Sequence, residues 1–73
     1  MEPAVAFGRA LRRLRKLRGM TQEKFGFEAE LRRTFISLLE LGQQQPTLAT
    51  IIKIAKVLDM QPSELIKEAE KDF

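Results

Sequence analysis

The chain contains no cysteine and no histidine among its 73 residues. Without cysteine it can have neither a disulfide framework nor a cysteine metal site. Without histidine it lacks both the usual catalytic base and the commonest metal ligand, and its Asp, Glu and Lys residues form no constellation with a nucleophile. We therefore expect no enzyme activity, no metal or other cofactor, and no small-molecule ligand.

Long apolar runs are also missing. No stretch approaches the roughly 18 apolar residues that a membrane-spanning helix needs. The first segment, MEPAVAFGRALRR, has too short an apolar stretch and no cleavage signal for a secretory peptide. We expect a cytoplasmic protein without a membrane partner. A basic amphipathic membrane helix over residues 4–18 is conceivable, but burial in a core explains the apolar stripe of that segment better.

Basic residues are concentrated in the first half of the chain. Up to Arg33 there are nine basic and four acidic residues, a net charge of +5, whereas from Thr34 onward there are four basic and six acidic residues, a net charge of −2. A basic half of this kind suits a polyanionic partner such as nucleic acid. A solvated basic helix face would explain the charge clustering equally well.

The apolar periodicity predicts an all-α fold in one domain over residues 1–73, without strands. Phe7, Leu11 and Leu14 form the stripe of a helix over about residues 4–18, which Gly19 ends as a C-cap glycine. Gly8 lies inside this helix, where its missing side chain permits a neighbouring helix to pack closely.

Two further helices are expected in the C-terminal half. Thr47 caps a helix over about residues 47–58, and Pro62 begins a last helix over about residues 62–70. Apolar residues surround the helix over 47–58 on almost every side. We therefore expect this helix to be the buried, central one.

The stretch from Thr21 to Gly42 predicts two short helices joined by a tight turn. The first begins at Thr21 as its N-cap, and the second covers about residues 32–41 with Ile36 and Leu39 facing inward. Such a pair forms a helix-turn-helix, whose second helix can enter the major groove of double-stranded DNA. We therefore expect a DNA-binding domain that acts as a homodimer, because so small a domain has a marginal core.

Two segments, FGRALRRLRKLRGMTQEKF and LRRTFISLLELGQQQPTLATIIKIAKVLDMQPSEL, together resemble the lambda-repressor-like family of helix-turn-helix proteins, the Cro and xre type. The run RRTFIS is also similar to small stand-alone members such as restriction–modification controller proteins. The resemblance covers about residues 7–66. It implies a compact five-helix domain that binds a palindromic operator as a dimer and regulates transcription.

The resemblance also implies roles for individual residues. The phosphate-contacting glutamine of the family falls on Gln22, and its base-reading positions fall on Arg33, Thr34 and Leu38. Arg33 could read guanine or contact a phosphate, and Gln22 could instead be an ordinary surface residue. Arg32 and Ser37 are assigned to phosphate contacts. The family's internal ion pair falls on Arg15 and Glu40. Without the family pattern, Arg15 and Glu40 would be interpreted as unrelated surface charges.

This chain departs from the family pattern at several positions. Glu30 stands where a turn glycine is usual, and a glutamate in a left-handed conformation costs roughly 1–2 kcal/mol, so we expect a different turn geometry. Gly26 replaces the usual alanine. Leu38 and Leu41 replace polar residues and should point largely outward. These two leucines support an alternative function, a protein-interaction module that keeps the fold and binds a partner through an apolar surface.

Overall fold

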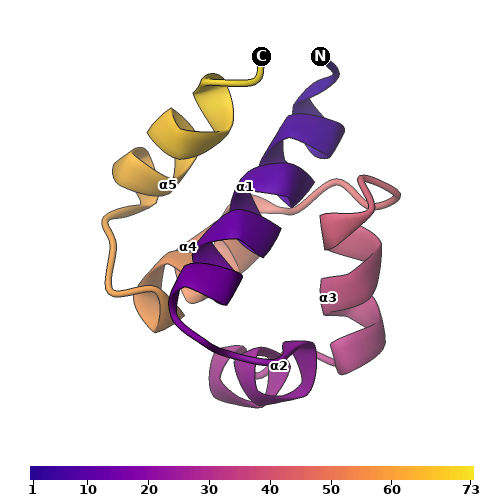
Figure 1. The fold of residues 1–73 in the computed structure, drawn as a ribbon, viewed down its shortest axis with the longest axis vertical. Coiled ribbons are helices and arrows are strands. Elements are labelled where there is room, and N and C mark those ends of the chain that lie inside the picture. Colours follow the sequence, from indigo (N-terminus) through magenta and orange to yellow (C-terminus); the bar gives the residue numbers. More distant parts are fainter.

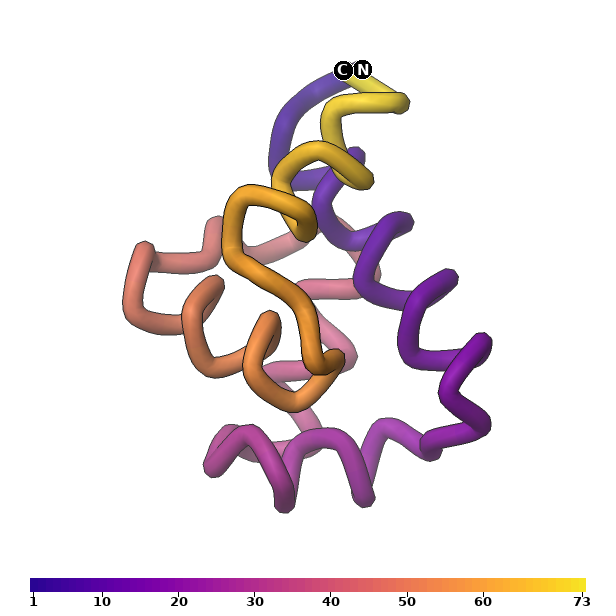
Figure 2. Tube along the Cα trace, turned by 90° about the vertical axis from the view of Figure 1, so that its left-hand side faces the viewer, coloured from indigo at the N-terminus to yellow at the C-terminus, as the bar shows by residue number.

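The computed structural model describes residues 1–73 and contains five helices, α1 (Pro3–Leu17), α2 (Gln22–Ala29), α3 (Arg33–Glu40), α4 (Leu48–Val57) and α5 (Pro62–Glu70). In Figure 1, α1 lies in front of α4, with α5 on one side, α3 on the other and α2 below. The two chain ends lie side by side in Figures 1 and 2. The expected all-α fold with five helices is confirmed. None of the helices combines the length and the apolar character that crossing a membrane requires.

One hydrophobic core joins all five helices. α1 packs against α3 and α5, while α4 packs against α2 and α5. Burial of these apolar side chains is the main force that holds short helices together, since helices of this length are marginal in isolation. The twelve buried members of the core are Phe7, Ala10, Leu11, Phe25, Ala29, Ile36, Leu39, Ile54, Ala55, Leu58, Leu65 and Ala69.

Polar side chains define where the helices begin. The Thr21 hydroxyl accepts a hydrogen bond from the backbone N–H of Lys24 at 3.1 Å, and the Thr47 hydroxyl does the same for Thr50. In α5 the carboxylate of Glu64 accepts the backbone N–H of Gln61 at 2.8 Å, next to Pro62 in the first helical position. The predicted helix starts at Thr21, Thr47 and Pro62 are confirmed. The two threonines each satisfy a backbone donor that the helix leaves free, and Pro62 stands at a position where no N–H is needed.

The prediction that α4 is buried all round is wrong. Ile54, Ala55 and Leu58 are buried, but 72% of Leu48 and 49% of Ile52 are exposed to solvent. The helix therefore has one face in the core and one apolar face outside it. α1 is the helix that contacts both α3 and α5, so the longest helix supports α3.

The prediction that the turn after α2 has a different geometry is also wrong. Glu30 adopts the left-handed conformation, with φ 58° and ψ 40°, and ends α2 there. The backbone N–H of Leu31 then donates to the carbonyl of Gly26 at 2.8 Å. A Cβ atom on Gly26 would stand 2.6 Å from the Leu31 carbonyl oxygen. The turn thus keeps its left-handed residue, and the missing side chain at Gly26 leaves room for the chain that follows.

The predicted close packing at Gly8 is confirmed. A Cβ atom at this position would overlap the carbonyl oxygen of Leu39 and would lie 2.8 Å from that of Glu40. Gly8 is therefore where α1 meets the backbone at the end of α3. Glycine lowers helix stability by roughly 1 kcal/mol relative to alanine. The close packing of the two helices that it permits offsets this cost.

We expect Gly8→Ala to lower the free energy of unfolding by about 1–3 kcal/mol, the usual cost of overpacking against atoms that cannot move aside. This steric cost exceeds the gain of roughly 1 kcal/mol in helix propensity. Chemical denaturation followed by circular dichroism measures the difference. Arg9→Ala, at the exposed neighbouring position of the same helix, is the control and should change stability by less than about 0.5 kcal/mol. Equal stability of Gly8→Ala and wild type would contradict the close contact.

Candidate nucleic-acid interface

The start of α3 presents three polar side chains to solvent. Arg32 is extended and caps the helix without a side-chain hydrogen bond, so the first N–H groups of α3 are not covered by a cap. Arg33 and Thr34 follow in the first turn, and all three residues are exposed. Further along the helix, the inward residues Ile36 and Leu39 are fully buried, as predicted. Burial of these two residues orients α3 so that its first turn faces outward.

A single carboxylate joins the helices around this surface. The Arg15 guanidinium in α1 donates two hydrogen bonds to Glu40 at the end of α3, from Nε at 2.6 Å and from Nη2 at 3.0 Å. The side-chain amide of Gln22 in α2 donates to the same carboxylate at 3.1 Å. Glu40 in α3 therefore accepts hydrogen bonds from α1 and from α2, and so joins the three helices. The structure brings together three residues that are 7 to 25 positions apart in the chain.

The pair of Arg15 and Glu40 is buried. Only 9% of the Arg15 side chain and 4% of the Glu40 side chain are exposed. The remaining Nη1 group of Arg15 donates to the backbone carbonyl of Met20 at 2.7 Å, which leaves no unsatisfied polar side-chain atom in the interior. The hydrogen bond from Arg15 to Glu40 raises the pKa of the guanidinium above its ordinary value, despite the cost of desolvation. Arg15 accordingly keeps its charge inside the domain.

One polar hollow contains several of the candidate residues. It is lined by Gln22, Arg33 and Arg15, together with Thr21 and Glu23. The beginning of α2 and the beginning of α3 therefore border the same depression. Backbone N–H groups at a helix start and a nearby guanidinium are the usual partners of an anion such as a phosphate.

Leu38 is less exposed than the sequence indicated. Both Ser37 and Leu38 are partly buried, whereas 60% of Leu41 lies in solvent. The prediction that Leu38 and Leu41 point outward together holds only for Leu41. The apolar surface required for a separate protein-interaction module is thus smaller than the sequence predicts.

The sequence did not predict the hydrogen bond between Gln22 and Glu40, since Gln22 was expected to be a phosphate contact or a surface residue. No local spacing could have revealed it, because the two side chains are 18 positions apart and meet only when α2 and α3 pack. The contact of Arg15 with the Met20 carbonyl was missed for the same reason. These contacts belong to the tertiary arrangement of the three helices.

Two short helices joined by a tight turn, the second with a solvent-exposed first turn, define a helix-turn-helix protein. A helix-turn-helix family model matches residues 11–65, and the chain belongs to this family. The control protein C.BamHI from Bacillus amyloliquefaciens is 43% identical over 61 residues, which cover 82% of this chain and 75% of that protein.

Solved structures show the same fold. The restriction-modification controller protein C.AhdI from Aeromonas hydrophila has a TM-score of 0.82 and 40% identity, covering 85% of this chain and 94% of that one. The clp gene regulator ClgR from Corynebacterium glutamicum has a TM-score of 0.93, covers 99% of this chain and 77% of that one, and is 21% identical, which shows the fold alone. The resemblance stated from the sequence is confirmed, including the similarity to restriction–modification controller proteins. The chain is a DNA-binding transcriptional regulator and not an enzyme.

We expect Glu40→Ala to lower the free energy of unfolding by about 3–5 kcal/mol, because it leaves the buried charge of Arg15 without a partner. Thermal and denaturant melts of the two proteins measure this loss. Glu28→Ala is the control, since Glu28 pairs with Lys24 on the exposed face of α2, where such a pair contributes about 0.3–0.5 kcal/mol. If both variants melted alike, Glu40 would not have the structural role described.

Proposed function

We propose that this chain binds a palindromic operator as a homodimer, with α3 of each copy in the major groove, and so regulates transcription. The observation that carries the proposal is that Arg33 and Gln22 line one polar hollow, with exposed Thr34 next to Arg33 in the first turn of α3. A helix start that offers a guanidinium, a hydroxyl and free N–H groups suits both base edges and phosphates. Residues 1–73 would act as one DNA-binding domain in the cytoplasm.

The first turn of α3 supplies the base-reading groups. Arg33 can donate two parallel hydrogen bonds to guanine, and Thr34 can exchange hydrogen bonds or touch a thymine methyl group. Leu38 follows Thr34 by one helical turn and, being partly exposed, can contact only the thymine methyl group among major-groove features. We assign these three residues to sequence readout.

Other polar groups contact the DNA backbone in this proposal. Arg32 precedes the reading positions, Ser37 lies between Thr34 and Leu38, and Gln22 stands at the first position of α2. Its amide is already held by Glu40 at 3.1 Å. A side chain fixed in this way loses little conformational entropy when it binds a phosphate, which favours the contact. Glu40 thereby supports the DNA contact through Gln22, without touching DNA itself.

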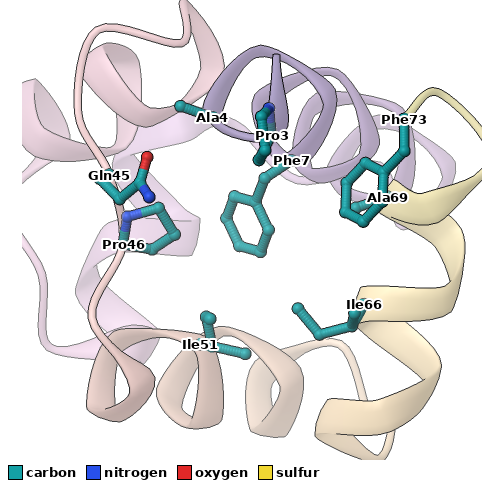
Figure 3. Close-up of a pocket in the computed structure, with 9 residues that line it drawn as sticks. All are labelled: Pro3, Ala4, Phe7, Gln45, Pro46, Ile51, Ile66, Ala69 and Phe73. Carbon is teal, nitrogen blue, oxygen red and sulfur yellow. The ribbon is translucent and has the colours of Figure 1, made fainter. Parts of the chain in front are cut away.

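The dimer interface lies on the C-terminal half in our proposal. Besides the exposed face of α4 with Leu48 and Ile52, 37% of Ile66 in α5 and 56% of Phe73 are exposed. An apolar pocket of about 130 Å³ lies next to this surface, and Figure 3 shows Ile66 and Phe73 at its edge, with Phe7 at its centre. Exposed apolar area of this kind marks an interaction site, and a second copy would cover it while both α3 helices stay free.

The similarity to C.BamHI and C.AhdI suggests which genes are regulated. C.AhdI is described as a restriction-modification controller protein, and C.BamHI as a control protein. We propose that the operator of this chain lies beside genes of a restriction–modification system.

Selection of bound sequences from random duplex DNA tests the proposed function. We expect a palindrome whose half-sites are separated by about 34 Å, one turn of the double helix, because a two-fold dimer places its recognition helices in successive major grooves. Sedimentation of the selected duplex with the protein should then give two chains per duplex. Recovery of no preferred sequence, or of complexes with only one chain per duplex, would speak against the proposal.

We expect Leu38→Ala to weaken binding to the selected operator by about 1–3 kcal/mol, the scale of one lost base discrimination. Non-specific binding and its salt dependence should hardly change, since no phosphate charge is involved. Replacing the contacted thymine by uracil should cause a similar loss with the wild type and no further loss with the variant. Leu41→Ala is the control, because its exposed side chain is not assigned to readout. Unchanged affinity in both tests would remove Leu38 from the reading residues.

A further inference from the structure

Most of the free positive charge of this protein lies outside the helix-turn-helix. Of the nine basic residues up to Arg33, four are engaged by a neighbouring group, namely Arg13, Arg15, Arg18 and Lys24. Five make no ion pair and no side-chain hydrogen bond, and all five are exposed: Arg9, Arg12, Lys16, Arg32 and Arg33. Only the last two lie at the start of α3. The other three belong to α1, whose outer surface the proposed function does not use.

Arg9, Arg12 and Lys16 form one stripe on α1, which we call the α1 stripe. They are separated by three and four positions, so they share one face of the helix. Gly8 and Arg15 face α3, and Arg13 reaches Glu68 in α5. The α1 stripe lies between these two contact faces, and all three of its residues are exposed. Figure 1 shows α1 at the front of the domain, with no other helix in front of it.

The α1 stripe begins next to the phosphate-binding end of α2. Lys16 is one residue before the end of α1, and α2 starts at Gln22 after a short connection. Figure 2 shows the last turn of α1 beside the first turn of α2. From Lys16 the stripe extends back along α1 to Arg9, over about 10 Å at 1.5 Å per residue. That is the axial length of about three phosphates on one DNA strand.

We propose that the α1 stripe binds DNA phosphates that flank the operator half-site, beyond the base pairs that α3 reads. A duplex whose backbone contacts Gln22 would continue past the end of α1, where three unpaired cations meet it. Charge complementarity favours this partner, because no carboxylate neutralises the stripe and a duplex is a dense line of negative charge. The inference rests on the proposed function, since it requires the chain to bind duplex DNA.

The test compares two lengths of the selected duplex, trimmed to the selected base pairs or extended by one helical turn, about 10 base pairs, on each side. Wild-type affinity is measured for both over a range of salt concentrations. The test variant is Arg9→Gln/Arg12→Gln/Lys16→Gln. Its matched control is Lys53→Gln/Lys56→Gln/Lys67→Gln, which removes equal charge from three exposed lysines of α4 and α5 that make no ion pair. Because these lysines lie near the proposed dimer interface, sedimentation first establishes that the control still forms two chains per duplex. If it does not, the single variant Lys67→Gln replaces it and is compared with the single variants of the stripe.

The wild type should show a steeper salt dependence on the extended duplex than on the trimmed one. Each phosphate contact contributes about 0.9 to the slope of log affinity against log salt, so the difference should be about 2 to 3 for each half-site. The α1 variant should lose this difference, and the control should keep it. Melting curves check that each variant is folded. The single variants Arg12→Gln and Lys16→Gln should each lose about 0.9 in slope for each half-site, and they replace the triple variant if it does not fold.

Two results would overturn the inference and leave the proposed function intact. One is wild-type binding to the trimmed duplex without any gain from the flanks. The other is a loss of affinity that does not depend on the flanks, seen as an equal loss for the α1 variant on both duplexes or as the same loss for the control variant. Either pattern would mean general electrostatic attraction. If the wild type bound neither duplex, the proposed function itself would be wrong, and the inference would fail with it.

Discussion

The helix-turn-helix depends on the hydrogen bonds that the buried carboxylate of Glu40 accepts. This carboxylate accepts two hydrogen bonds from Arg15 in α1 and one from Gln22 in α2, while the backbone that carries it ends α3. A charge in the interior is tolerated only when it is paired and fully hydrogen-bonded, and here both conditions are met. Removing any partner would leave a desolvated polar group, so the three helices are held in one relative orientation.

Close packing at Gly8 makes this network possible. The backbone carbonyls of Leu39 and Glu40 approach α1 at the position where a side chain is missing. Arg15 lies seven residues, about two turns, further along α1 and so on the same side. The approach at Gly8 therefore brings the Arg15 guanidinium within reach of the carboxylate. Sterics and electrostatics act on the same pair of helices, and together they orient the outward-facing turn of α3.

Strain in the turn before α3 is compensated locally. Glu30 adopts a left-handed conformation that costs roughly 1–2 kcal/mol for a residue with a side chain. The following chain then crosses Gly26, where a Cβ atom would meet the carbonyl of Leu31. The two departures from the family pattern are therefore adjacent in space. Glu30 adopts the left-handed conformation that the tight turn needs, and the missing side chain at Gly26 avoids a clash with the chain after the turn.

The sequence alone determined the class of fold, the helix starts and the inward residues of α3, because capping groups and apolar periodicity act over a few neighbouring residues. It could not determine that Gln22 meets Glu40, or that α4 exposes Leu48 and Ile52. Both depend on how helices distant in the chain pack, and an all-apolar helix does not reveal which side the core covers. Nor could net charge show which basic residues are neutralised, since Arg13 and Arg15 find their partners 25 or more positions away. Only the tertiary contacts show that Arg9, Arg12 and Lys16 of α1 are unpaired, because they show which of the other basic residues have partners.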